Sequence, residues 1–375
     1  MTEVRLDNRV RHERERLGLS QQSLAEKVGV SRQAIVAIET GKSVPSTVLG
    51  LRIARSLRSR VEDLFSLSSE AGIAVRLAPA EGPPDTEPTA SGGARVALGE
   101  VGDRWAAHRL PQDASVAADG LIAADASGRT AVVRPLADLA QLRRNVLVAG
   151  CAPLLGGLAR RIGDAPDARA TWLPAGSTRA LELMKDGFIH VAGVHFGESA
   201  PGENNASRTR RALPGTRALL IALTRWRLGL VVPTGNPLGI RSGSDLLRPG
   251  LRLARREEGS GARKLLMSLL AAEGVQRSTL PGPIAAGHAE VAQLVRCGAA
   301  DVGVAIEGVA LAAGLGFVPL VEERFDLVVR ANLADWAPVS RLLETLDDPG
   351  FRADAAQLPG YDVESCGHVI TLEAA

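Results

Sequence analysis

Polar side chains bracket a short apolar repeat between residues 31 and 40. Ser31, Arg32 and Gln33 precede the repeat, and Thr40 follows it. The repeat, Ala34–Ile38, has the spacing of one helix face, so the four polar residues lie at or beside the ends of that helix. Guanidinium, amide and hydroxyl groups in such places hydrogen-bond to base edges in the major groove. The chemistry predicted here is recognition of DNA.

A second set of polar residues follows glycines at predicted strand-to-helix junctions. Cys151, Ser177 with Thr178, and Ser260 each occupy such a place, and Arg263 falls in the first turn after the last junction. Free amides at helix starts, with hydroxyls beside them, form a pocket for an anion or a polar small molecule. The alternative for any one junction is a simple helix cap in a tight turn.

Two short helices around a turn position the first set. Ser20 is placed to cap the first helix, apolar positions within 24–28 form its inner face, and Gly29 breaks the period. The alternative is an ordinary helical hairpin with a solvated polar face. Residues 1–67 carry 12 Lys and Arg against 8 Asp and Glu, whereas the whole chain has a net charge of +2. The basic surplus therefore lies with these helices, as attraction to phosphate requires.

The segment SQQSLAEKVGVSRQAIVAIETGKSVPS resembles the repressor and Cro type of helix-turn-helix, the xenobiotic-response-element family, over roughly residues 5–67. The resemblance implies that Arg32 and Gln33 reach base edges and that Gln21 lies near a phosphate. It also makes Lys42 and Arg11 candidates for contacts with the DNA backbone. The implied domain is all-α, with five helices at Asp7–Leu17, Gln21–Val28, Arg32–Glu39, Ser46–Leu57 and Val61–Phe65.

Length and composition set the outer bounds. A chain of 375 residues is expected to fold into two or more units. Because it has neither an apolar run of 18 residues nor a secretory start, we expect no membrane span and no secretion signal. Cys151, Cys297 and Cys366 are far apart and form no zinc or disulfide pattern, which favours buried, reduced thiols in the cytoplasm.

Four parts are predicted along the chain. The helix-turn-helix domain, 1–67, is followed by a linker, 68–93, because AEGPPDTEPTASGG at 80–93 is expected to be mobile. Within this linker only Ile73–Leu77 is strand-like. A small β segment, 94–142, follows, and its strands are expected within 95–110 around Gly102-Asp103 and at Ala117–Ala124 and Thr130–Arg134 around Ser127-Gly128.

Residues 143–375 alternate strands, glycine-containing turns and helices. This repetition predicts parallel strands with helices on the faces of the sheet. Two segments, near residues 230 and 325, have the pattern of a chain that passes between two such sheets. The predicted architecture is a two-lobed α/β clamp.

Six segments carry a second resemblance: VAGCAP, PAGSTRALELMKDGFIHVAGVHF, LGLVVPTGNPLGI, REEGSGARKLL, HAEVAQLVRCGAADVGVAIE and FVPLVEERFDLVV. They are similar to the periplasmic-binding-protein-like domain related to molybdate-binding proteins, over about residues 143–370. The resemblance implies a type II fold whose ligand lies in the cleft between the lobes. Matching junctions imply that the cleft is lined by Cys151, Ser177, Thr178, Ser260, Arg263, His288 and Glu307.

The sequence departs from that family in two places. Ala262 stands where such domains commonly have Thr, and Cys-Ala-Pro at 151–153 stands where Cys-Asp-Pro is common. Glu257 and Glu258 flank the predicted anion loop and would repel an oxyanion unless they point outward.

Other patterns point away from metal chemistry and catalysis. His190 and His195 straddle a predicted strand, and their odd spacing of five puts them on opposite faces, which argues against a shared metal ion. No nucleophile elbow and no phosphate-binding loop of the P-loop type are present. We therefore predict no metal, no cofactor and no enzymatic activity.

The predicted protein is multidomain: an all-α five-helix DNA-binding domain, then a two-lobed α/β domain of the type II periplasmic-binding-protein class. The predicted function is a cytoplasmic one-component transcription regulator, a homodimer on double-stranded DNA, with no membrane association. Its effector is a small molecule, expected to be an oxyanion such as molybdate or tungstate. Two alternatives are an enzyme or carrier of molybdenum-cofactor metabolism with an autoregulatory DNA-binding domain, and a constitutive DNA-binding protein whose clamp has lost its ligand.

Overall fold

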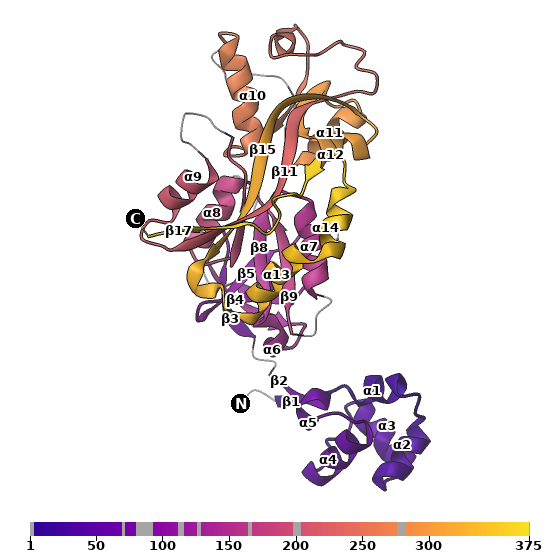
Figure 1. Ribbon diagram of the computed structural model, residues 1–375. Helices are drawn as coiled ribbons and strands as arrows, with labels where there is room; N and C mark the ends of the chain where they lie inside the picture. Colours follow the sequence, from indigo (N-terminus) through magenta and orange to yellow (C-terminus); the bar gives the residue numbers. More distant parts are fainter. Residues whose placement is uncertain are drawn as a thin grey trace. The chain divides into compact units, whose positions relative to one another are not determined.

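The computed structural model describes residues 4–69, 72–79, 93–111, 116–125, 129–163, 167–197, 204–275 and 282–374. The chain divides into two compact units, Met1–Ile73 and Ala74–Ala375 (Figure 1). Among the described residues, no helix has the length and apolar character that crossing a bilayer requires.

The first unit contains the five predicted helices. Three of them are capped by serine side chains: the hydroxyl oxygens of Ser20, Ser31 and Ser46 each accept a hydrogen bond from a backbone N–H in the first turn. Gly29, with a φ of 73°, ends the second helix in the left-handed conformation that glycine adopts without strain. The helices are α1 (Val10–Arg16), α2 (Gln21–Val28), α3 (Arg32–Glu39), α4 (Thr47–Ser56) and α5 (Val61–Leu64).

The first unit also contains a two-stranded sheet that was not predicted. Strand β1 (Val4–Asn8) pairs antiparallel with β2 (Phe65–Ser69), and the N–H of Arg9 donates to the carbonyl of Leu64. The prediction of a purely α-helical domain with a first helix from Asp7 is therefore wrong at this point. The backbone groups of residues 4–8 form hydrogen bonds with β2, at the other end of the unit in sequence, so α1 begins only at Val10.

A buried ion pair fixes α3 against α1. The guanidinium of Arg14 donates to both carboxylate oxygens of Glu39, with Nε 2.6 Å from Oε1 and Nη2 3.1 Å from Oε2. The two side chains are 8% and 2% exposed. The orientation of the recognition helix therefore rests on a paired charge and on the apolar contacts of Leu24, Ile35 and Ile38.

The second unit begins with a small closed barrel. Its strands confirm the predicted hairpin around Gly102-Asp103, and the predicted turn at Ser127-Gly128 lies outside the described residues. Residues 73–77, placed in the linker, instead pair with the barrel through Arg76 and Ala106, while residues 80–92 of that linker lie outside the described part. The barrel strands are β3 (Ile73–Leu77), β4 (Arg95–Val101), β5 (Arg104–Arg109), β6 (Gly120–Asp125) and β7 (Thr130–Pro135).

A large sheet with helices on it forms the rest of the second unit. The strand order is β13-β12-β14-β11-β15-β10-β8-β9, and β16 and β17 pair with β11. The strands are β8 (Asn145–Gly150), β9 (Arg169–Pro174), β10 (Val191–Val194), β11 (Ala218–Val232), β12 (Leu253–Arg256), β13 (Ile284–Ala285), β14 (Val302–Ile306), β15 (Gly316–Arg330), β16 (Tyr361–Asp362) and β17 (Val369–Leu372). The helices are α6 (Leu139–Leu142), α7 (Leu154–Gly163), α8 (Ser177–Lys185), α9 (Asn205–Ala212), α10 (Gly261–Ala272), α11 (His288–Arg296), α12 (Glu307–Ala312), α13 (Ala337–Asp347) and α14 (Pro349–Ala356).

Two long antiparallel strands, β11 and β15, run side by side through this sheet (Figure 1). At one end β15 pairs with β10, beside parallel β8 and β9; at the other end β11 pairs with β14, beside parallel β12 and β13. We call the first group, with α7 and α8, the first lobe, and the second group, with α10 to α12, the second lobe. The predicted two-lobed α/β architecture, with crossings near residues 230 and 325, is confirmed.

His190 joins the barrel to the first lobe. Its Nδ1 accepts the N–H of Leu147 at 3.0 Å, so Nε2 carries the proton and donates to the carbonyl of Glu100 in β4, at 2.9 Å. Burial is the main reason that the pKa of His190 is lowered from 6.5 to about 4. The ring is therefore a neutral connector, and protonating Nδ1 would break its bond to β8.

Lowering the pH from 6.5 to 4 is expected to destabilise the second unit. The unfolded chain binds a proton at the ordinary pKa of 6.5, whereas the folded chain does so only near 4, so stability is fully present above 6.5 and is lost as the pH falls through this window. The measurement is the midpoint of thermal unfolding against pH. His190→Gln should flatten its slope, whereas His12→Gln, at a side chain that is 76% exposed, should not. Identical slopes for wild type and His190→Gln would contradict this role.

Candidate functional site

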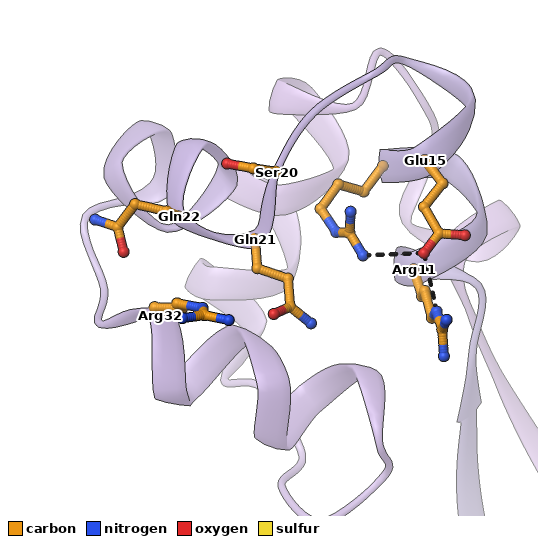
Figure 2. Close-up of a pocket in the computed structure, with 7 residues that line it drawn as sticks. Arg11, Glu15, Ser20, Gln21, Gln22 and Arg32 are labelled. Atoms are coloured by element: carbon orange, nitrogen blue, oxygen red, sulfur yellow. Dashed lines mark hydrogen bonds and ion pairs between the residues drawn. The ribbon is translucent and has the colours of Figure 1, made fainter.

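The exposed start of α3 is the candidate DNA interface. Arg32 and Gln33 are both exposed in its first turn, behind the capping hydroxyl of Ser31, which accepts the N–H of Ala34 at 3.2 Å. Arg32 lines an open pocket together with Gln21 and Gln22 of α2 and with Arg11 of α1 (Figure 2). Three helices therefore bring donor groups to one surface.

The other predicted DNA contacts differ in how free their side chains are. Lys42 is exposed, and Arg11 is 71% exposed while it pairs with Glu15. Gln21 donates to the carboxylate of Glu39 at 3.0 Å, and Thr40 donates to a carbonyl of its own helix at 2.8 Å. Gln21 and Thr40 therefore have structural bonds that a DNA contact must share or replace.

In the second unit, the starts of α8 and α10 meet between the lobes; we call this contact the lobe interface. Thr178 Oγ1, in the first lobe, donates to the carbonyl of Gly259, in the second lobe, at 3.1 Å. A Cβ built on Gly261 would lie 2.8 Å from Cε1 of His195, so only glycine lets α10 approach this ring so closely.

The predicted hydroxyls at the lobe interface have internal partners. Ser177 Oγ accepts the N–H of His195 at 3.0 Å and donates to the carbonyl of the same residue at 3.2 Å. Ser260 Oγ caps α10 by accepting the N–H of Arg263, and it donates to the carbonyl of Glu257. These two serines therefore act as structural caps and connectors.

The charged residues around the glycine-rich loop also pair with one another. Arg263 donates to the carbonyl of Arg256 at 3.1 Å and to Glu258 at 3.3 Å, and the Glu258 side chain is 91% exposed. Glu257 accepts two hydrogen bonds from Arg256, each 2.7 Å long. Glu258 thus points outward, as an oxyanion would require, whereas Glu257 is neutralised by a buried arginine.

Glu307 is likewise held by an arginine. Its two carboxylate oxygens accept hydrogen bonds of 2.7 and 2.8 Å from Arg227 in β11. The pair ties α12 to the strand that crosses between the lobes, which gives Glu307 a structural task at the position predicted to line the cleft.

Cys151, His195 and His288 come together at the lobe interface. Cys151 follows β8 and His195 follows β10, both in the first lobe, whereas His288 is the first residue of α11 in the second lobe. The thiol and one ring nitrogen from each histidine lie within 4.8 Å of one another. Cys151 and His288 were predicted to line the cleft, whereas His195 was not.

The surroundings of His195 and His288 shift their pKa values in opposite directions. Burial opposes a charge on His195, but Cys151 and Glu323 outweigh burial and raise its pKa to about 10. Burial, with Arg256 and His195 nearby, holds the pKa of His288 well below its usual value. At neutral pH the two imidazoles of the cluster therefore differ in charge: His195 is protonated and His288 is neutral.

Aromatic side chains from the crossing strands enclose this cluster. The centroid of the Trp226 ring, in β11, lies 5.2 Å from the centroid of the His195 ring and 5.9 Å from that of the His288 ring. Phe325, in β15, stacks on His195 at 5.9 Å, and burial raises the pKa of Tyr361 beside Cys151. Sequence reasoning had no signal for Trp226 or Glu323, because both reach the site only through strand pairing.

Two family models match the chain. The model described as the PBP superfamily domain matches residues 159–347, and the helix-turn-helix model matches residues 10–64. These ranges lie within the second and the first unit, respectively.

Relatives are found for both parts. The chain is similar to the protein YvgK of Bacillus subtilis (strain 168), with 30% identity over 230 residues that cover 61% of this chain and 74% of YvgK. Its N-terminal part is similar to an HTH-type transcriptional regulator of Methanothermobacter thermautotrophicus, with 50% identity over 62 residues that cover 16% of this chain and 90% of that regulator. Among solved structures, the sulfate-binding protein SubI from Mycobacterium tuberculosis H37Rv aligns with 58% of this chain and 86% of its own, at 17% identity and a TM-score of 0.45.

Proposed function

We propose that this chain, which belongs to the PBP superfamily and carries an N-terminal helix-turn-helix domain, is a one-component transcription regulator of the cytoplasm whose DNA binding responds to a small ligand. The observation that carries the proposal is the exposed start of α3, with Arg32 and Gln33 presented beside donors from α1 and α2. The positive surplus of residues 1–67 supports the same role. The proposal assigns binding, and no catalytic step, to the second unit.

We further propose that the regulator acts as a homodimer. One helix-turn-helix reads only a few base pairs, so useful specificity calls for two half-sites about one helical turn apart. The first unit offers an apolar surface for such pairing: Val44, Val48 and Leu51 are 69%, 61% and 47% exposed. Exposed apolar side chains grouped in this way are typical of interaction surfaces.

Coupling between ligand and DNA requires that the ligand prefer one arrangement of the lobes. A preference of about 1–3 kcal/mol is enough for the coupling seen in typical allosteric proteins. Thr178 donates across the lobe interface to the carbonyl of Gly259, so a ligand bound between the lobes would replace such contacts and shift the balance between lobe arrangements.

For the ligand, we propose an oxyanion such as molybdate or tungstate, held by Arg256 and the starts of α8 and α10. Arg256 is 2% exposed, and its Nη1 has no hydrogen-bond partner among the described residues. A buried guanidinium N–H beside helix N-termini suits a tetrahedral anion. Arg263, the arginine favoured by the sequence, is already bonded to Glu258 and to the Arg256 carbonyl.

Arg32→Ala is expected to weaken binding to a selected operator by about 1–3 kcal/mol and to relax base preference at its contact. Lys42→Ala should instead weaken binding to all DNA sequences similarly and reduce the dependence of affinity on salt concentration, because a phosphate contact carries no information about the bases. The measurement is fluorescence anisotropy with an operator selected from random duplex DNA, at several salt concentrations. If Arg32→Ala leaves both affinity and base preference unchanged, α3 is not the reading element.

Calorimetry of the metal-free full-length chain tests the oxyanion. Molybdate or tungstate should bind to the wild type, and Arg256→Gln should abolish the binding because the only buried guanidinium donor proposed for the anion is lost. Arg263→Gln is the matched control and should bind as the wild type does. Absence of heat with both oxyanions would exclude this ligand, and equal binding by Arg256→Gln would exclude the role of Arg256. Both outcomes leave the DNA-binding role in place.

A further inference from the structure

The cluster of Cys151, His195 and His288 has the composition of a transition-metal site. A thiolate and two imidazoles are ligands that Zn²⁺ prefers, at distances of about 2.3 Å for sulfur and about 2.0 Å for nitrogen. In a tetrahedral arrangement such ligand atoms lie roughly 3.6 Å apart. Since the three ligand atoms are already within 4.8 Å of one another, a contraction of about 1 Å would bring them onto one ion.

His288 supplies an independent sign of a missing partner. Its ring is buried, with 1% of the residue exposed, yet neither Nδ1 nor Nε2 has a hydrogen-bond partner in the described parts of the chain. A buried polar group without a partner loses its hydration and gains no hydrogen bond, so such groups are rare unless a ligand or ion satisfies them. His288 is the first residue of α11, and the centroid of its ring lies 5.9 Å from that of the His195 ring.

Glu323 orients the second histidine in the manner common around metal ions. Its Oε2 lies 2.6 Å from Nδ1 of His195, and both side chains are almost fully buried. With Nδ1 committed to this carboxylate, Nε2 is the nitrogen left to bind an ion. A carboxylate behind a ligating histidine fixes the ring and makes it a better ligand.

The local charges also balance for a divalent ion. The Cys151 thiolate and the Glu323 carboxylate together carry two negative charges, which match the two positive charges of Zn²⁺. Arg256, the nearby cation, already forms a two-bond ion pair with Glu257, so it contributes little net charge. Burying the loaded site therefore leaves no uncompensated charge.

We propose that Cys151, His195 and His288 form a binding site for Zn²⁺ between the lobes. Zinc enters as the divalent ion, and it replaces the proton of the Cys151 thiol and the proton on Nε2 of His195, both of which go to solvent. No change of oxidation state is involved. Three protein ligands leave a fourth position, which water or a small anion fills, as in zinc sites that keep an open position.

The site also joins the two lobes, because Cys151 and His195 belong to the first and His288 to the second. An ion held by all three favours the arrangement in which the lobes touch. That this arrangement also changes affinity for DNA rests on the regulatory function proposed above. Zinc is then an input to the regulator, either alone or as the anchor for an anionic effector.

Cobalt substitution tests the site directly on the full-length chain. Chelator-treated protein titrated with Co²⁺ should bind one ion per chain and develop the visible bands of four-coordinate cobalt with a thiolate-to-cobalt charge-transfer band. Addition of Zn²⁺ should remove the visible bands and the charge-transfer band, because it displaces Co²⁺. Cys151→Ser should lose the charge-transfer band, and His288→Gln should lose tight binding. Glu323→Gln should keep the band but lower metal affinity by about 10- to 100-fold.

Cys297→Ser is the matched control, since Cys297 is an exposed thiol at the end of α11, and this variant should behave as the wild type does. Circular dichroism of each metal-free variant checks that the fold is retained. Absence of the charge-transfer band in the wild type, or its persistence in Cys151→Ser, overturns the site. Operator affinity measured with and without Zn²⁺ separates the zinc site from its effect on DNA binding. If the zinc-loaded and metal-free proteins bind the operator equally, the site stands and the effect on DNA binding is overturned. Failure to bind any operator overturns the proposed regulatory function alone.

Discussion

The pairing of β11 with β15 is the constraint on which the second unit depends. Each strand is fifteen residues long, and their ladder continues from the first lobe, where β15 meets β10, to the second lobe, where β11 meets β14. The ladder has two register shifts: the one at Ala222/Thr224 lies at the edge of the β10 attachment, and the one at Leu228/Gly229 lies within the stretch of β11 that pairs with β14. Irregular pairing bends strands and re-aims side chains, so the crossing segment is where the lobes can change their relative orientation.

The same segment supplies the enclosure of the Cys151, His195 and His288 cluster. Trp226 and Glu323 are cross-strand partners in the ladder, and Phe325 lies two residues further along β15. Because these three side chains contact or surround His195, a movement of β11 against β15 would displace groups that touch the cluster directly, with no intermediate element. This link between the crossing and the cluster supports the proposal that the lobe interface responds to a bound ligand or ion.

How much the sequence predicted depends on whether the deciding interaction is local. Helices α2 and α3 were predicted at their observed bounds, because serine caps, Gly29 and apolar spacing all act within a few residues. Strand β1 was missed and β3 was placed in a linker, because both are fixed by partners far along the chain. The spacing of His190 and His195 predicted opposite faces of the strand, and in the structure His190 bonds to Leu147 and Glu100 whereas His195 bonds to Glu323. That spacing carried no information on the thiol and the imidazole that other elements bring to His195. The hydroxyls of Ser177 and Ser260 show the limit of junction patterns, since a cap and a ligand contact require the same residue type.

The central claim is that the arrangement of the lobes controls DNA binding, and an engineered disulfide across the lobe interface tests it most directly. A Cβ built on Gly259 would lie 3.5 Å from Cβ of Thr178, within the usual range for a disulfide, so Thr178→Cys with Gly259→Cys should lock the lobes when oxidised. Because Gly259 has a φ of +85°, a cysteine there strains the backbone in both redox states, so the reduced double variant is the reference. If the arrangement of the lobes controls DNA binding, operator affinity should differ between the oxidised and reduced protein by about 5- to 150-fold, as expected for an allosteric coupling of about 1–3 kcal/mol. Equal operator affinity in the two redox states, with the disulfide shown to be formed, would contradict it.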